Sequence, residues 1–231
     1  MKKKLVIFGA DIMAKIVFEY FSRDSEYEVV AFTVDEKYKK QDTYLELPLI
    51  SFEKIEEFYP PEEFYLFIAI GTSKMNQNRE LKCIQAKNKN FKLASYISPF
   101  AICDSEIGDN TIVADMTIIR PGVKIGDNNY FWEQCFVAGD TIIGNNCSFS
   151  AKSSVNTFSQ IEDNVILGTG SIVKTSVKVA KKTLAGAASY ISINTKENGV
   201  YGEKSTPLAG CISDKIIYQF NYGNSSLWNC L

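Results

Sequence analysis

Four lysines lie close together late in the chain and could bind an anionic ligand. They fall within nine residues, at Lys174, Lys178, Lys181 and Lys182. No acidic residue occurs between Asp163 and Glu197, so this stretch is locally cationic. Ammonium groups at this density can bind phosphate groups. They could instead keep the end of an extended fold soluble and prevent association through its edge, and the sequence leaves both interpretations open.

Histidine is absent from all 231 residues, which removes several kinds of active site. Histidine is the side chain whose ordinary pKa lies near neutral pH, so a Ser-His-Asp triad, a Cys-His pair and a three-histidine zinc site are all excluded. A general base would have to be a carboxylate, a lysine, a tyrosine, a cysteine or the substrate itself. No metal site is predicted.

A glycine-containing motif near the N-terminus could hold a nucleotide. It reads GADIMA from Gly9, so Asp11 stands where a dinucleotide fingerprint has its second glycine. A carboxylate at a helix start more often caps the helix. We therefore expect Asp11 to be a cap and NAD not to bind. A nucleotide-linked sugar could still contact Gly9, Ala10 and Asp11, and Asp35 and Gly71 at the ends of the next predicted strands.

The elements that would position these residues alternate along the first hundred residues. Strand patterns cover 4–9, 28–33, 64–70 and 93–97, and helical patterns cover 12–21 and 73–87. Strands separated by helices favour a parallel sheet with helices on its faces. We therefore predict an α/β, Rossmann-like domain over residues 1–98.

A six-residue repeat dominates the second half. A large apolar residue recurs at every sixth position, at Ile107, Val113, Ile119, Ile125, Phe131, Val137, Ile143, Phe149, Val155, Ile161, Leu167, Val173 and Val179. A smaller residue stands four positions after each, beginning with Thr111, and the period of a strand places both on one face. Three six-residue sides would close a triangle of 18 residues, with tight corners between short strands.

Residues 107–184 resemble the hexapeptide-repeat family, whose fold is a left-handed parallel β-helix found in acyltransferases. The order of the segments VIFGA, FIAIG, YISPFA and the repeats resembles that of sugar acetyltransferases in bacterial surface-polysaccharide and sialic-acid pathways. The resemblance implies an α/β Rossmann-like unit followed by a left-handed parallel β-helix over 99–188. Residues 189–231 would cap the β-helix or contact a neighbouring subunit.

The resemblance also implies a reaction. Such proteins are homotrimers that pass an acetyl group from acetyl-CoA, or an acyl group from another acyl-CoA, to an amine or hydroxyl of a sugar, often nucleotide-linked. The pantetheine arm would lie between neighbouring β-helices, near Gly168, Thr169, Gly170, Ser171, Ala185 and Gly186. Lys174 and Lys178 would meet the phosphates of coenzyme A.

The sequence departs from this family where the chemistry should lie. The position of the family's catalytic histidine aligns with Gly139, and only the acidic neighbour, Asp140, remains. Trp132 replaces a smaller residue and would crowd the substrate cleft or stack on the substrate. Three explanations stay open: the substrate is an amine that arrives deprotonated, Asp140 or Glu133 is a base with a raised pKa, or catalysis is lost and a sugar-binding, nucleotide-binding or scaffolding role remains.

Composition excludes other classes. The net charge is -2 and 22 of the 25 basic residues are lysines without a basic stripe, so no nucleic-acid partner is expected. The six cysteines are scattered without a Cys-x-x-Cys pair, which predicts reduced, mostly buried thiols. The apolar run from Leu5 to Ala10 is too short for a signal peptide and no segment could span a bilayer, so we expect a cytoplasmic protein.

Overall fold

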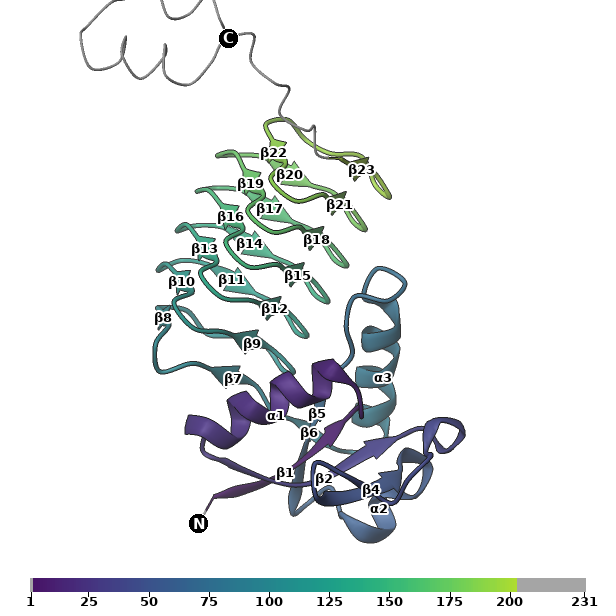
Figure 1. Ribbon diagram of the computed structural model, residues 1–231. Coiled ribbons are helices and arrows are strands. Elements are labelled where there is room, and N and C mark those ends of the chain that lie inside the picture. Colours follow the sequence, from purple (N-terminus) through teal and green to yellow (C-terminus); the bar gives the residue numbers. More distant parts are fainter. Residues whose placement is uncertain (1, 203–231) are drawn as a thin grey trace, which may run out of the picture.

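The computed structural model describes residues 2–202 and shows two stacked parts. An α/β domain comprises the N-terminal residues, and a triangular solenoid of short strands rises from it (Figure 1). This is the predicted arrangement of a Rossmann-like unit followed by a left-handed parallel β-helix.

The N-terminal domain is built on a six-stranded sheet in the order β3-β4-β2-β1-β5-β6. Only the β3–β4 pair is antiparallel. The strands are β1 (Lys3–Phe8), β2 (Tyr27–Val34), β3 (Thr43–Tyr44), β4 (Leu47–Ser51), β5 (Phe64–Ile68) and β6 (Lys92–Leu93). The helices are α1 (Ile12–Asp24), α2 (Ile55–Phe58) and α3 (Gln77–Asn88), with 3-10 turns η1 (Glu36–Tyr38) and η2 (Phe52–Lys54).

Most predicted elements of this domain are present, and two differ. The helix predicted from residue 73 begins only at Gln77, because Lys74, Met75 and Asn76 adopt left-handed backbone angles. The strand predicted over 93–97 splits. Its first part is β6, and its second part is β7, which pairs with the solenoid instead of the N-terminal sheet.

The solenoid has three parallel faces, which we name by their strand numbers. The seven-strand face contains β7 (Tyr96–Ile97), β9 (Ile112–Val113), β12 (Tyr130–Phe131), β15 (Ser148–Phe149), β18 (Ile166–Leu167), β21 (Leu184–Ala185) and β23 (Val200–Tyr201). The six-strand face contains β8 (Ile102–Cys103), β10 (Ile118–Ile119), β13 (Phe136–Val137), β16 (Ser154–Val155), β19 (Ile172–Val173) and β22 (Tyr190–Ile191). The four-strand face contains β11 (Lys124–Ile125), β14 (Ile142–Ile143), β17 (Gln160–Ile161) and β20 (Lys178–Val179).

The repeat explains the interior of the solenoid. Large residues one coil apart stack on each other, as Phe131 does on Phe149 with ring centroids 4.4 Å apart. The smaller residues of the repeat share this interior, and Cys135 and Cys147 among them are buried free thiols. The backbone turns between strands through a left-handed residue at every sixth position, for example Asn128, Gln134 and Asp140.

The solenoid continues past residue 188, where we predicted its end. Strands β22 and β23 pair with β19 and β21, so the coils run from Tyr96 to Tyr201. Ile191 is still in phase and buried. The repeat then fails, and the side chains of Asn194 and Thr195 accept hydrogen bonds from the backbone of Lys178 and Ala180, in place of a strand. Residues 203–231 lie outside the described part.

Three corners join the faces, and we number them in chain order. The first corner, between the seven-strand and six-strand faces, includes residues 132–135, 168–171 and 186–189. The second, between the six-strand and four-strand faces, includes 120–123, 138–141 and 174–177. The third leads back to the seven-strand face and includes 108–111, 126–129 and 144–147. No helix in residues 2–202 is both long and apolar enough to cross a membrane.

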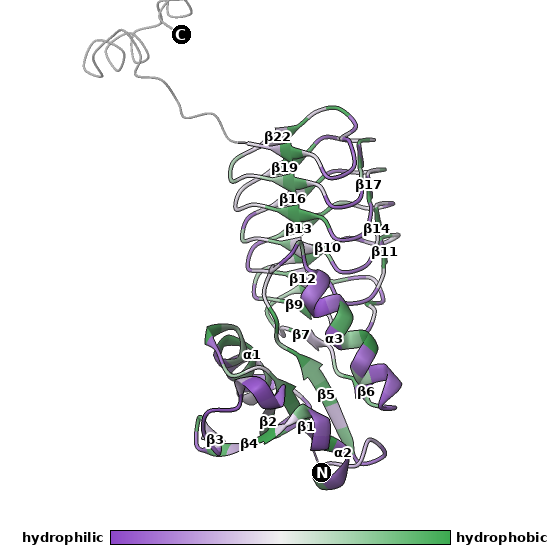
Figure 2. Cartoon of the chain, turned by 90° about the vertical axis from the view of Figure 1, so that its right-hand side faces the viewer, coloured by the Kyte–Doolittle hydropathy of each residue, from purple (hydrophilic) through white to green (hydrophobic). Residues whose placement is uncertain are grey.

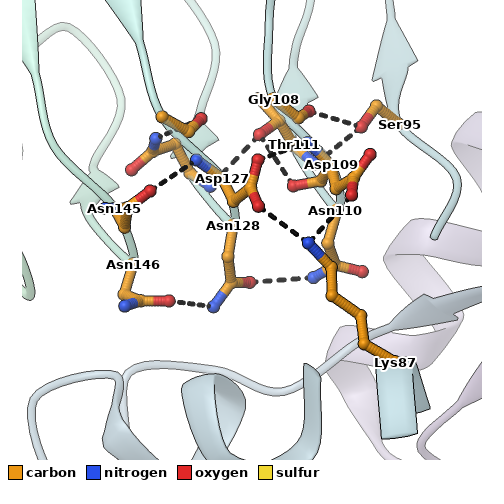
Figure 3. A network of polar contacts seen from close by, with 12 residues as sticks. Lys87, Ser95, Gly108, Asp109, Asn110, Thr111, Asp127, Asn128, Asn145 and Asn146 are labelled. Carbon is orange, nitrogen blue, oxygen red and sulfur yellow. Dashed lines mark hydrogen bonds and ion pairs between the residues drawn. The ribbon is translucent and has the colours of Figure 1, made fainter. Parts of the chain in front are cut away.

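The third corner is held by ladders of polar side chains, which Figure 3 shows. Asn110 donates to Asn128 at 2.8 Å, and Asn128 donates to Asn146 at 2.7 Å. The Lys87 ammonium of α3 bridges the carboxylates of Asp109 and Asp127 at 2.9 and 2.8 Å. Helix α3 is therefore fixed along this corner.

Candidate functional site

A pocket of about 610 Å³ lies at the carboxyl ends of β1, β2 and β5. Parallel strands of an open α/β sheet end together at one edge, which is where such sheets bind ligands. The pocket brings together four of the residues predicted to bind substrate, Gly9, Ala10, Asp11 and Asp35. Gly71 is not in its wall but follows Ile70, which is.

Asp11 caps helix α1, as predicted. Its Oδ1 accepts hydrogen bonds from the backbone N–H groups of Met13 and Ala14 at 3.0 and 3.2 Å. Those two donors are therefore not free for a phosphate. Gly9 has a φ of 134°, and a Cβ there would lie 2.9 Å from the carbonyl oxygen of Ala69. The packing of β1 against β5 thus requires this glycine whether or not a ligand binds.

Asp35 forms an ion pair with Lys82 inside the pocket. The Lys82 Nζ lies 2.5 Å from the Asp35 Oδ1, and the lysine side chain is only 9% exposed. The same ammonium lies over the rings of Phe8 and Phe52, at 4.7 and 4.4 Å from their centroids. This environment holds the Asp35 carboxylate in place at the end of β2 and neutralises its charge.

Glu133 and Asp140, the two predicted carboxylate bases, lie at different corners of the solenoid. Glu133, at the first corner, accepts a hydrogen bond of 2.5 Å from the Tyr20 hydroxyl of α1. Burial and this carboxylate both raise the pKa of Tyr20 above its usual value. The contact joins α1 to the solenoid, so the carboxylate of Glu133 already has a structural partner.

Gly139 and Asp140 lie at the second corner, where the backbone leaves little space. Asp140 is exposed and occupies the left-handed position of its turn with a φ of 57°. A Cβ on Gly139 would lie 2.9 Å from the carbonyl oxygen of Pro121, one coil below. A larger side chain therefore does not fit at position 139 unless the turn moves.

Trp132 packs at the junction between the two parts of the chain. Its ring meets Tyr130 edge-on, with centroids 5.9 Å apart, and it contacts the core that the N-terminal domain shares with the first coils. The indole is half-buried there. Part of the surface of the predicted stacking platform is thus already used in packing.

The residues predicted to hold the pantetheine arm lie at the first corner or, for Ala185, at the strand end beside it, but not all are accessible. Thr169 is exposed, and Gly170 is left-handed at φ 66° with no other atom within 4 Å of a Cβ there. Gly168 is crowded, because its Cβ would meet the Ala187 nitrogen at 2.6 Å. Ser171 and Ala185 are buried in the interior. Open space at this corner therefore lies around Thr169 and Gly170, with Gly186 one coil above.

The lysine cluster of the sequence does not form one patch. Lys174 lies at the second corner, whereas Lys178 lies on the four-strand face and pairs with Glu162 at 2.6 Å. Lys181 and Lys182 follow at the third corner. The coil turns through about a third of its circuit every six residues, so neighbours in sequence are carried to different sides.

The sequence did not single out the residues through which α3 and its preceding turn shape the pocket. Lys74, Asn78, Leu81, Lys82 and Gln85 line it, and the last four share one helical face. The helical spacing of these residues could have been recognised in the sequence. The strand ends that this helical face contacts could not. Within residues 2–202 no three acidic, cysteine or histidine side chains are grouped so that they could hold a metal ion.

Comparisons with known proteins agree with both parts of the fold. Residues 4–81 match the model of the PglD N-terminal domain, and residues 104–139 match the model of the bacterial transferase hexapeptide with six repeats. No curated protein matches the chain.

Three solved structures share the whole architecture at low sequence identity. The acetyltransferase domain of PglB from Neisseria gonorrhoeae is 23% identical, with a TM-score of 0.79 over 90% of this chain and 100% of that one. PerB from Caulobacter crescentus, in complex with CoA and GDP-perosamine, is 21% identical, with a TM-score of 0.77 over 87% and 94%. WeeI from Acinetobacter baumannii is 21% identical, with a TM-score of 0.72 over 85% and 94%. The fold class and the resemblance read from the sequence are confirmed.

Proposed function

We propose that this chain is a sugar acyltransferase that uses acetyl-CoA, or another acyl-CoA, without a histidine base. Its acceptor is the amino group, in preference to a hydroxyl, of a nucleotide-linked sugar used in surface-polysaccharide biosynthesis. One observation carries the proposal: a pocket of about 610 Å³ at the strand ends of a Rossmann-like domain is joined in one chain to a hexapeptide β-helix.

The pocket suits a nucleotide in size and in polar groups. Ligand sites for small molecules commonly measure about 300–1,000 Å³. An acidic residue at the end of the second strand is the usual partner of a ribose hydroxyl in such domains, and Asp35 occupies that place. PerB, which has the same fold, was solved with CoA and GDP-perosamine together. These points support a nucleotide-linked sugar as the acceptor.

The outer side of the six-strand face supports assembly into a homotrimer. Ile102, Phe136, Ile172 and Tyr190 are exposed on β8, β13, β19 and β22 of this face, and the half-buried Ile118 and Ser154 occupy the same position on β10 and β16. Figure 2 draws the strands of this face as a column of mostly hydrophobic residues, inward-facing and outward-facing ones together. Exposed apolar patches of this kind mark interaction surfaces. In a closed ring of three copies, the first corner of one copy would lie beside the second corner of the next, and the pantetheine arm would lie between them.

Acyl transfer between these corners needs no general base if the acceptor is an unprotonated amine. The amine nitrogen attacks the thioester carbonyl and forms an amide, the C–S bond breaks, and the proton of the amine leaves with the thiolate as coenzyme A. Positioning of the two reactants can supply a large share of the acceleration. A general base accelerates such a step by about 10²–10⁴-fold. Transfer to an unprotonated amine proceeds without this contribution.

The second candidate function is a trimeric homologue that binds a sugar or nucleotide, or acts as a scaffold, without catalysis. Two observations favour it: the Glu133 carboxylate is engaged by Tyr20, and the backbone of Pro121 crowds position 139. Both functions use the same pocket, so only the transfer step separates them.

Calorimetry with acetyl-CoA, combined with a coenzyme A release assay against a panel of nucleotide-linked amino sugars, tests the proposal. We expect acetyl-CoA to bind and at least one amino sugar to release coenzyme A above the rate of thioester hydrolysis. Binding of nucleotide sugars with neither acetyl-CoA binding nor release would establish the non-catalytic alternative.

A further inference from the structure

The turn that leads from β5 into α3 has an unusual backbone. Lys74, Met75 and Asn76 have φ angles of 50°, 53° and 63°, so three successive residues with side chains are left-handed. Each such residue costs free energy because its Cβ approaches the following carbonyl oxygen. Strained backbone persists only where surrounding contacts hold it, and it is often found at ligand sites.

Buried contacts with the β-helix hold this turn. Asn76 is fully buried, its Nδ2 donates to the carbonyl oxygen of Asn146 at 2.7 Å, and its Oδ1 accepts from the Ser148 hydroxyl at 3.0 Å. Both partners lie on one coil of the solenoid. The end of the turn is therefore fixed to the β-helix, while its start belongs to the pocket.

Arg79 strengthens this anchor one helical turn later. Its guanidinium is fully buried, lies 3.9 Å from the centroid of the Tyr130 ring and donates to the carbonyl oxygens of Ile70 and Cys147 and to the Oδ1 of Asn128. Ile70 lines the pocket, so Arg79 ties the pocket wall directly to the coils.

Within residues 2–202, Lys74 is the pocket lysine whose ammonium makes neither an ion pair nor a cation–π contact. Lys82 pairs with Asp35, and the Lys37 ammonium lies over the Tyr38 ring at 4.8 Å. Lys74 lines the pocket and forms no ion pair with any residue between 2 and 202. The first N–H groups of α1 are already bound by Asp11. Of the three pocket lysines, Lys74 therefore has the ammonium that an anionic group can bind without breaking an ion pair or a ring contact.

We propose that Lys74 binds the diphosphate of a nucleoside diphosphate in this pocket, and that the strained turn anchored by Asn76 positions it there. The proposal rests on the proposed function in one respect, that the pocket takes a nucleotide-linked sugar. It adds the residue that recognises the phosphates and the device that holds this residue in place.

Calorimetry with UDP, GDP and dTDP, each compared with its nucleoside, tests the contact. We expect the wild type to bind at least one diphosphate more tightly than the nucleoside. Lys74→Met should reduce that diphosphate affinity about tenfold or more and leave nucleoside affinity unchanged, since hydrogen bonds to charged groups are worth this much. Lys37→Met, a matched loss of charge at the same pocket, should change the diphosphate affinity less than threefold.

A second variant tests the positioning. Glycine adopts left-handed backbone without strain, so Asn76→Gly removes the anchor while it tolerates the turn. Lys74→Met lowers the logarithm of the diphosphate affinity by a certain amount in the wild type. In the Asn76→Gly background, the same substitution should lower it by less than half of that amount. A thermal melt confirms that each variant is folded.

The outcomes separate this inference from the proposed function. If the wild type binds a diphosphate and Lys74→Met binds it equally well, the inference is wrong and the proposed function stands. Full additivity of the two substitutions overturns the positioning role alone. If the wild type binds none of the three diphosphates, the nucleotide part of the proposed function falls together with the inference.

Discussion

The carbonyl oxygen of Pro121 lies 2.9 Å from the position that a Cβ on Gly139 would occupy. The two residues stack one coil apart at the second corner of the solenoid. This close approach means that the chain does not simply lack a histidine at position 139. Its backbone is packed so that a side chain there must displace the turn beneath it, and a mechanism without a base at this position fits that packing.

The first prediction is that Gly139→His lowers stability and does not raise activity. Forcing a side chain into a packed site costs about 1–3 kcal/mol, so the melting temperature should fall. Coenzyme A release should stay equal or decrease. Gly139→Ala is the matched control, because it introduces the Cβ contact without an imidazole. A tenfold or larger gain in turnover with Gly139→His would show that the position can still hold the missing base.

The second prediction separates the two carboxylates. Removing the half-buried hydrogen bond between Tyr20 and Glu133 should lower the free energy of unfolding by about 1.5–3 kcal/mol, because the acceptor is a carboxylate. We expect this loss for Tyr20→Phe in urea unfolding. Asp140→Asn, at an exposed corner, should change stability by less than about 0.5 kcal/mol and leave turnover unchanged. A tenfold drop in turnover for Asp140→Asn would identify it as a base after all.

The third prediction concerns alkaline pH. Burial and the hydrogen bond that Tyr96 donates to Asp24 raise the pKa of Tyr96 to about 12. The folded state therefore keeps this proton where the unfolded chain, with a tyrosine pKa near 10, loses it. The stabilisation is complete below pH 10 and is lost as the pH rises towards 12. Urea midpoints should fall faster for the wild type than for Tyr96→Phe above pH 10, and parallel curves would contradict this.

The fourth prediction concerns Arg79, whose guanidinium is fully buried and donates to acceptors on both parts of the chain. Arg79→Ala removes the donor from the carbonyl oxygens of Ile70 and Asn128 and the cation from the face of Tyr130, so we expect a loss of about 2–4 kcal/mol in unfolding free energy. A lysine ammonium is a point charge without the planar, forked donor arrangement of a guanidinium. Arg79→Lys should therefore recover less than half of the unfolding free energy that Arg79→Ala loses. Arg120→Ala is the control, since its ion pair with Asp104 is exposed and worth about 0–1 kcal/mol. Equal losses for positions 79 and 120 would refute the bridging role.

The fifth prediction tests the trimer. A charge on the six-strand face, as in Ile172→Glu, should dissociate the assembly into monomers in sedimentation velocity. Ile142→Glu is the matched control, because Ile142 is equally an exposed isoleucine but lies on the four-strand face. If both variants remain trimeric, or both dissociate, the six-strand face is not the specific interface.

The sequence was sufficient for the solenoid because its repeat is local. Each large residue of the repeat, such as Phe131 or Val137, faces inward in whichever coil it lies. The fixed spacing along the chain is therefore enough to determine the fold. Glycine at position 139 was visible in the same way. The closeness of Pro121 was not, because it depends on how two coils stack.

The pocket could be predicted only from the strand side. Strand ends and helix starts can be predicted from sequence. Two pocket residues, Gly9 and Asp35, directly follow strands, and a third, Asp11, caps a helix. Lys74 and Lys82 reach the pocket from α3 and its turn, and their placement depends on Arg79 and Asn76 docking on the solenoid. Contacts between residues that lie 49 to 72 positions apart in the chain leave no periodic signal.

The most direct test of transfer without a base is the pH profile of coenzyme A release with a nucleotide-linked amino sugar. If the acceptor must arrive deprotonated, log kcat/KM should rise with unit slope as the pH increases and level off at the pKa of the substrate amine, in Asp140→Asn as in the wild type. A profile that levels off well below that pKa would reveal a base in the protein. No release above thioester hydrolysis at any pH would contradict the enzymatic function itself.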